Sequence, residues 1–200
     1  QTGVARRAAA GDIAILFRSR DGHQTFQRAI EQRGIPSYVY KGLGFFDADE
    51  VKDVFALLRY LANPVSELRA AAFLRSRFAR LSDVALVRLA PGLSAAMVGP
   101  AERDGDLDAD DRAVLAALRR VVPSWLALAD RIRPSELLDR VLDQTAYAFE
   151  LGSLDEGPAR RQARENLKKV RGLVRRIENR GYATLARVAD YLDRLSSGDE

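Results

Sequence analysis

The sequence predicts a mainly α-helical protein that begins with a small α/β unit. Short apolar runs rich in strand-forming residues flank one helical segment within the first 40 residues, whereas from Asp49 onward apolar residues recur at helical spacing. The composition is that of a globular protein, with 47% hydrophobic and 30% charged residues among 200. A chain of this length can bury a core without disulfides or metals.

The expected α/β unit consists of a strand, a helix and a second strand. Residues 12–17 (DIAILF) form the first strand and residues 21–33 the helix, which ends at Gly34. Pro36 opens the second strand, residues 37–40. A strand, a helix and a strand within about 30 residues have the size of a parallel crossover unit.

The helical section is punctuated by cap and breaker residues. We expect Ser66 and Ser82 to cap helices, and Pro123 and Pro134 to separate helices. The boundary between the two sections is expected between Asn63 and Leu81. The expected helices cover residues 49–61, 66–75, 82–90, 110–122, 136–147, 158–180 and 185–195.

The residue inventory excludes several classes of site. The chain has no cysteine, which excludes a disulfide framework, a thiolate zinc site and a cysteine nucleophile. His23 is the only histidine, so the sequence offers almost no residues for a histidine metal site or a serine–histidine relay. No apolar run approaches the roughly 20 residues that span a bilayer. We therefore expect no metal site in a soluble, cytoplasmic protein.

The charge pattern favours anionic partners. The net charge is +4, and only four of the 32 basic residues are lysines. Arginine suits bidentate phosphate binding, although a GC-rich genome explains the same bias. The acidic stretch 99–111 lacks the twelfth-position glutamate of an EF-hand, so we expect a solvated loop there. Because the chain starts with Gln1 and ends in the linker-like run 196–200, we also expect a piece of a longer protein.

Four ordered blocks of the sequence resemble motifs of the superfamily-one helicases of the UvrD/Rep/PcrA and RecB/AddA type. The blocks are motif IV at 11–19 (GDIAILFRS), the "G-I-P-Y" strand at 33–38 (RGIPSY), motif IVa at 42–53 (GLGFFDADEVKD) and its continuation at 57–64 (LLRYLANP). Residues 74–76 and 81–83 look more like the RecB/AddA branch. Residues 166–170 and 191–192 are similar to the helical insertion of that branch.

The resemblance implies a domain organisation and a function. Residues 1–75 would be the N-terminal part of the RecA-like motor domain 2A, and residues 76–200 the helical 2B subdomain. The Walker motifs and the T-x-H-x-x-K-G-L motif are absent from the chain. The resemblance therefore implies a non-catalytic fragment of an ATP-dependent 3′-to-5′ DNA helicase or helicase-nuclease in repair or recombination. ATP and Mg would be bound by the full-length parent, and its partners would be single-stranded DNA, the duplex junction and the remaining motor domains.

The resemblance also assigns roles to residues. Arg18 matches the motif IV arginine that reaches the γ-phosphate of ATP, so its implied catalytic role is that of an arginine finger. Phe17 matches the aromatic residue that stacks on adenine. The motif IVa residues are Gly42, Phe45, Glu50 and Asp53. The alternative for the two acids is that they are helix N-terminal acids favoured by the helix dipole. The alternative for Gly42-Leu43-Gly44 is a tight turn before a helix.

A basic face on the helix expected at 158–180 is a candidate DNA contact. That helix carries nine basic residues against two acidic ones, and its apolar seam fixes which side is buried. Arg164, Lys168, Arg171 and Arg175 share the outward side, which is typical of contact with a duplex phosphate backbone. The alternative is a solvated face paired with the acidic stretch 99–111.

Two functions of other classes stay open at this stage. The chain could be a stand-alone helical DNA-binding adaptor without a motor, or a protein-interaction module whose basic face is only solvated. Walker and T-x-H-x-x-K-G-L motifs in the parent gene would distinguish the helicase from both.

Overall fold

The computed structural model describes residues 6–18, 22–35, 37, 45–100, 102–145, 147, 158–181 and 184–197. The chain divides into two compact units, residues 1–45 and residues 46–200, which are described separately. The described residues are mainly helical and contain no strand, which confirms the helical class predicted from the sequence. None of the described helices is long and apolar enough to cross a membrane.

The first unit contains a short 3-10 helix, η1 (Ala10–Asp12), and the helix α1 (His23–Glu31). Residues 13–17, expected as a strand, are irregular and have no neighbouring strand among the described residues. Ile13, Ile15 and Leu16 are 50–93% exposed. A strand is stabilised by ladder hydrogen bonds to a neighbour, so the apolar run alone does not produce one. The expected α/β unit is not present in the described part of the chain, and residues 38–40 lie outside it.

The end of α1 was predicted correctly. Gly34 has φ +69°, the left-handed conformation that follows many helices and that glycine adopts at little cost. The N–H of Gly34 donates to the carbonyl of Glu31 at 2.8 Å, and that of Ile35 to the carbonyl of Ile30 at 3.2 Å. These bonds pair carbonyls that the end of the helix leaves without partners.

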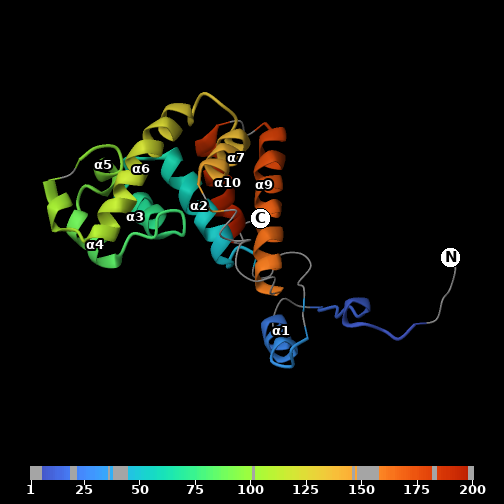
Figure 1. Cartoon of the computed structure of the whole chain (residues 1–200). Helices are drawn as coiled ribbons and strands as arrows, with labels where there is room; N and C mark the ends of the chain where they lie inside the picture. The colour runs from blue at the N-terminus through green and yellow to red at the C-terminus, as the bar shows by residue number, and fades with distance from the viewer. Residues whose placement is uncertain are drawn as a thin grey trace. The chain divides into compact units, whose positions relative to one another are not determined.

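The second unit is built around α2, which contacts α3, α9 and α10 (Figure 1). Val51, Val54 and Leu57 of α2 are fully buried, as the apolar spacing predicts. The elements of this unit are α2 (Asp49–Ala62), α3 (Glu67–Arg75), α4 (Asp83–Leu89), α5 (Leu93–Ala96), η2 (Glu102–Asp106), α6 (Ala109–Leu128), α7 (Pro134–Gln144), α9 (Pro158–Asn179) and α10 (Leu185–Ser197).

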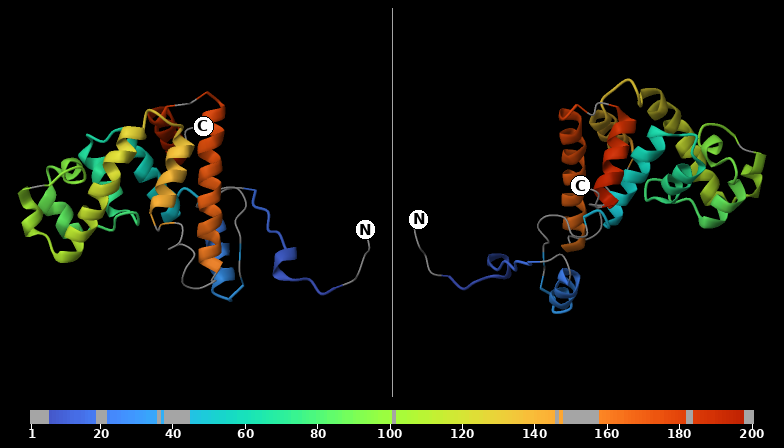
Figure 2. Two further views of the ribbon diagram at one scale, coloured as in Figure 1. Left: turned by 45° about the horizontal axis from the view of Figure 1, so that its top comes forward. Right: turned by 180° about the vertical axis from the view of Figure 1, so that it is seen from behind.

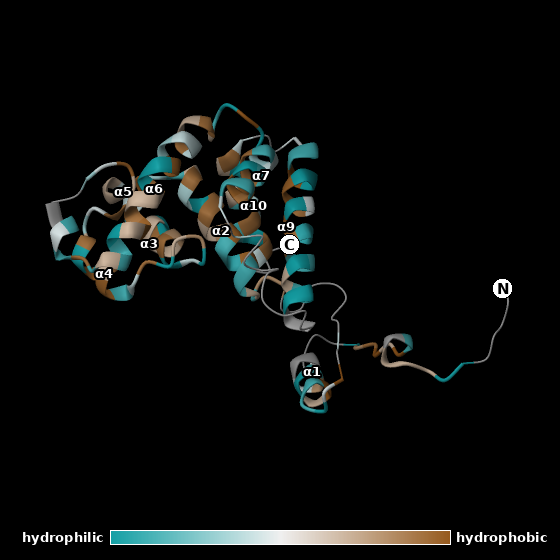
Figure 3. Cartoon of the chain, in the orientation of Figure 1, coloured by the Kyte–Doolittle hydropathy of each residue, from teal (hydrophilic) through white to brown (hydrophobic). Residues whose placement is uncertain are grey.

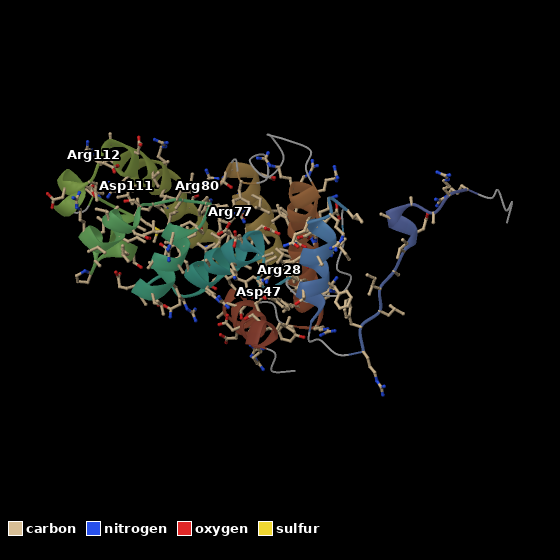
Figure 4. The ribbon with its side chains drawn as sticks, turned by 90° about the horizontal axis from the view of Figure 1, so that it is seen from below. Arg28, Asp47, Arg77, Arg80, Asp111 and Arg112 are labelled. Atoms are coloured by element: carbon tan, nitrogen blue, oxygen red, sulfur yellow. The ribbon has the colours of Figure 1, made fainter. Side chains whose placement is uncertain are left out.

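The predicted serine caps are present. The Ser66 side chain accepts a bond from the N–H of Arg69 at 3.4 Å, and that of Ser82 accepts from the N–H of Ala85 at 3.0 Å. Each hydroxyl pairs one of the N–H groups that the first turn of a helix leaves unbonded. The Ser82 hydroxyl and N–H in turn donate to the carboxylate of Asp111, which lies in the first turn of α6 (Figure 4).

Pro123 does not end a helix, contrary to the prediction. Helix α6 continues through it from Ala109 to Leu128. A proline inside a helix removes one hydrogen bond and costs about 3 kcal/mol. Val122 and Trp125 on either side are fully buried, and the Trp125 Nε1 donates to Gln144 Oε1 of α7 at 2.6 Å. Burial of two large side chains offsets the proline penalty, which a local sequence signal does not reveal.

Helices α7 and α9 pack side by side and antiparallel (Figure 2). The first turn of α7 is capped from α9, because the Glu178 carboxylate accepts from both the N–H and the hydroxyl of Ser135. Further along the pair, Asp139 of α7 contacts two arginines of α9. The α9 seam is buried as predicted, at Ala163, Leu167, Val170, Val174 and Ile177.

Candidate nucleotide and nucleic-acid contacts

Phe17 and Arg18 follow one another at the end of the irregular segment after η1. The Phe17 ring meets the Phe26 ring of α1 edge-on, with centroids 5.2 Å apart and planes at 75°. Phe17 is 41% exposed, and Arg18 is also exposed. An exposed aromatic ring and an exposed arginine that follows it in the sequence offer the two kinds of contact that an aromatic base and a phosphate require.

The motif IVa residues lie in a different environment. Gly42 lies outside the described residues, and Phe45 is half-buried. Glu50 and Asp53 belong to α2 and are only 7% and 8% exposed. Glu50 does lie in the first turn of the helix, but both carboxylates are bonded to residues from distant parts of the sequence, so the helix dipole alone does not explain them.

A buried polar cluster surrounds these acids; we call Glu50, Asp53, Arg77, Tyr147 and Asn166 the α2 acid cluster. Arg77, which is labelled in Figure 4, follows α3 in the sequence. Its Nε donates to Asp53 Oδ2 at 2.7 Å, and its Nη2 lies 3.5 Å from Glu50 Oε2. The Tyr147 hydroxyl donates to Asp53 Oδ2 at 2.8 Å. Asn166 of α9 donates to Glu50 Oε1 at 2.7 Å.

Within the α2 acid cluster, the surroundings keep Arg77 charged and Tyr147 neutral. Burial opposes the charge of Arg77, but its bond to Asp53 and the neighbouring acids outweigh this effect and raise the pKa of Arg77. Burial, followed by the charge of Asp53, raises the pKa of the Tyr147 hydroxyl, so Tyr147 remains a neutral donor. The Tyr147 ring also stacks on Phe78 with centroids 4.0 Å apart.

The α2 acid cluster is arranged to hold helices together. Both carboxylates already accept bonds from other side chains, and no group of three acidic or histidine side chains suited to a metal occurs in the described part of the chain. The cluster connects α2 with the segment after α3, with Tyr147 and with α9. If Arg77 were removed, the buried carboxylates of Glu50 and Asp53 would lose their cation. The large free-energy cost of keeping their charges away from water would then no longer be offset.

Sequence reasoning did not single out Arg77 and Tyr147. A signal was present, because Glu50 and Asp53 share the helical face of the buried residues Val54 and Leu57. Acids on an apolar helix face require buried partners. Their identity depends on tertiary packing, since Arg77 and Tyr147 lie 24 and 94 positions from Asp53.

The basic face of α9 has the predicted residues, but they already have acidic neighbours. Arg164 and Lys168 are exposed, and Lys168 Nζ lies 2.8 Å from Glu165 Oε1 on the same helix. The ion pair with Lys168, aided by nearby basic residues, lowers the pKa of Glu165. The outer side of α9 is strongly hydrophilic (Figure 3).

Asp139 bridges the other two residues of the predicted face. Arg171 Nε lies 2.7 Å from Asp139 Oδ1, and Arg175 Nη2 lies 2.7 Å from Asp139 Oδ2. The partner expected by the solvated-face alternative, the acidic stretch 99–111, is therefore not the partner of these two arginines. In that stretch Asp104 pairs with Arg119 instead.

The chain is similar to known proteins over its whole length. A sequence model of the UvrD-like helicase C-terminal domain matches residues 2–93. Over 209 residues, covering all of this chain, the chain is 28% identical to an ATP-dependent helicase/nuclease subunit of Geobacillus kaustophilus. These matches support a UvrD/RecB-like fragment. The corresponding helicase/nuclease proteins of Heliobacterium modesticaldum and Desulforudis audaxviator are 32% and 31% identical over 92% and 94% of this chain.

The similarity extends beyond the motif blocks. Matches that cover 92–100% of the chain include the helices after residue 93, where the resemblance of the sequence to UvrD/RecB-like helicases is diffuse. The chain spans 14–16% of the length of these helicase/nuclease relatives. The coarse prediction, a helicase-family segment whose relatives are ATP-dependent enzymes, is thus confirmed.

Proposed function

We propose that this chain is the non-catalytic part of an ATP-dependent, 3′-to-5′ DNA-translocating enzyme of repair or recombination, in which it supplies a nucleotide contact and a DNA contact. Residues 1–75 would belong to motor domain 2A and residues 76–200 to the 2B subdomain. The observation that carries the nucleotide contact is the exposed Phe17 ring, held edge-on by Phe26 at 5.2 Å, with Arg18 next along the chain.

In this proposal Phe17 stacks on the adenine of ATP, and Arg18 contacts the γ-phosphate. The chemistry of the two side chains suits ATP, because the Phe17 ring can stack on a base and the Arg18 guanidinium can bind phosphate oxygens. Bound ATP supplies the phosphoryl group whose transfer to water drives translocation. Arg18 stabilises the charge that develops on the transferred group and so acts mainly on the transition state.

The described residues of this chain offer no group of side chains that could bind magnesium. They contain no group of three or more acidic or histidine side chains that could hold a metal ion, and both acids of the α2 acid cluster already bind other side chains. No step in the proposed mechanism is therefore assigned to a metal held here. The residues that cradle phosphate and metal would come from the remaining motor domains.

The DNA contact is proposed for Arg164, Lys168, Arg171 and Arg175 of α9. Arg164, Lys168 and Arg175 are exposed, and Arg171, which flanks the buried seam, is partly exposed. A row of cations on one helix neutralises backbone phosphates without reading sequence, and its affinity for DNA falls with salt.

The test of the nucleotide contact is the steady-state ATPase of the full-length protein with single-stranded DNA. We expect Arg18→Ala to lower kcat by about 10³-fold or more, with a smaller effect on ATP affinity. Arg28→Ala is the matched control, since Arg28 is an arginine of the same unit that the proposal leaves without a role. Unchanged kcat for Arg18→Ala would remove the arginine-finger assignment.

A further inference from the structure

Asp139 holds two arginines of the proposed DNA contact with a single carboxylate. Arg171 and Arg175 stand one turn apart on α9, and each places one nitrogen 2.7 Å from a different oxygen of Asp139. Two like charges one turn apart repel each other. The carboxylate between them relieves that repulsion, as an anion with two or more oxygens would.

The geometry of this contact matches that of a bound phosphate group. A carboxylate that accepts one bond per oxygen from two guanidiniums presents the same acceptor pattern as two oxygens of a phosphodiester. A guanidinium has five N–H donors, and the contact with Asp139 uses one nitrogen from each arginine. The Arg171 and Arg175 side chains are 39% and 57% exposed, whereas Asp139 is 25% exposed. An incoming phosphate can therefore reach the arginines from the solvent side.

We infer that Asp139 competes with DNA phosphate for Arg171 and Arg175 and so weakens duplex binding by α9. This inference rests on the proposed function, because it assigns a regulating residue to the proposed DNA contact. Before a phosphate binds, the arginines must give up some of their contact with Asp139, and the carboxylate then stands next to the phosphate as a like charge. The result is a surface that binds DNA backbone more weakly than its arginines would alone.

The competition also lowers the salt dependence of binding. Each phosphate contact that releases a condensed counterion adds about 0.9 to the slope of log K against log salt concentration. An arginine that stands next to the Asp139 carboxylate is already partly neutralised, so its binding of a phosphate releases fewer counterions than the same contact would without Asp139. Removal of the Asp139 charge should therefore steepen the slope by up to about 1.8, which is the contribution of two contacts.

The test is duplex binding by the full-length protein across a salt series, with Asp139→Asn as the variant. Two partly exposed ion pairs compete only weakly with a phosphate, so we expect Asp139→Asn to bind duplex about 2- to 30-fold more tightly. Asp104→Asn is the matched control. Asp104 is also 25% exposed and pairs with an arginine, Arg119, which belongs to α6 and not to α9. The control should leave affinity and slope unchanged.

Two further variants separate the inference from the proposed DNA contact. Arg171→Gln together with Arg175→Gln should abolish the gain from Asp139→Asn, because the gain passes through these arginines. Lys168→Glu tests the DNA contact independently of Asp139. If Lys168→Glu weakens binding while Asp139→Asn leaves it unchanged or weaker, the competition is refuted and the DNA contact survives. If neither substitution changes binding, both the DNA contact and the competition are refuted.

Discussion

Asp53 and Tyr147, 94 positions apart in the sequence, share a hydrogen bond of 2.8 Å in the interior of the second unit. The same Asp53 oxygen also accepts from Arg77. One carboxylate thereby connects α2 with two distant segments, so the loss of either donor should destabilise the packing of this unit.

Arg77→Met should lower the free energy of unfolding by about 3–5 kcal/mol, because it leaves two buried acids without their cation. Tyr147→Phe should cost less, about 1–3 kcal/mol, since Asp53 keeps its bond to Arg77. Urea denaturation measures both changes. Arg75→Ala is the control: its ion pair with Asp83 is 72% exposed on both sides and should contribute at most about 1 kcal/mol. Equal losses for Arg77→Met and Arg75→Ala would contradict the role of the cluster.

Glu67 should make stability depend on pH. Burial disfavours its charge, but the N–H groups of Gly92, Leu93 and Ser94 donate to its carboxylate and lower the pKa of Glu67 below its ordinary 4.5. A lowered pKa adds stability that is complete above the ordinary value and is lost as the pH falls through the folded-state value.

We therefore expect Glu67→Gln to lower the free energy of unfolding by about 1–2 kcal/mol at pH 7. Below pH 4.5 the difference in stability between the variant and the unsubstituted protein should shrink. Denaturation at several pH values measures this difference. Glu136→Gln, which removes an exposed i,i+4 pair with Arg140, is the control and should have little effect at any pH. A Glu67→Gln difference that persists unchanged at low pH would show that the charge is not the cause.

Phe17→Ala should raise the KM for ATP in the full-length protein while kcat changes little. Stacking on a base is worth about 1–3 kcal/mol, so we expect an increase of roughly 5- to 150-fold. Because the stacking exists in the ground state, it is uniform binding. Phe17→Tyr keeps the ring and should keep the KM. Loss of kcat at unchanged KM would contradict the assignment of Phe17 to adenine.

The 200-residue chain alone should hydrolyse ATP only at the background rate, with or without single-stranded DNA. Phosphoryl transfer needs a phosphate cradle and a metal-ligand set, and the chain has no Walker motif. A coupled ATPase assay of the purified chain measures this directly. Turnover that survives Arg18→Ala in the same preparation would contradict the proposed division of labour between domains.

Local signals in the sequence predicted the helices of the second unit well. Ser66 and Ser82 cap helices as expected, because a cap acts within one turn. Pro134, expected to precede a helix that begins at residue 136, is itself the first residue of α7. Pro123 was misjudged because the burial of Trp125 depends on α7, which no local pattern reveals. The strand expected at 12–17 failed for a similar reason, since a strand needs a partner.

The candidate site was predictable in outline. The resemblance located Phe17, Arg18 and the motif IVa acids, and helical spacing located the basic face of α9. The sequence could not reveal that Asp139 lies between Arg171 and Arg175, because an acid on an exposed helix face has no local pattern that names its partner. The roles assigned to the site residues and the boundary between residues 75 and 76 stay predictions.

Helices α7 and α9 each supply the acid that the other needs: Glu178 of α9 caps α7, and Asp139 of α7 binds α9. The two contacts lie at different heights along the antiparallel pair. A slide of one helix by a single turn, about 5.4 Å, would separate Glu178 from Ser135 and would separate Asp139 from at least one of its two arginines. These contacts fix the register of the two helices. We therefore expect α7 and α9 to move together as one rigid body in any conformational change of the second unit.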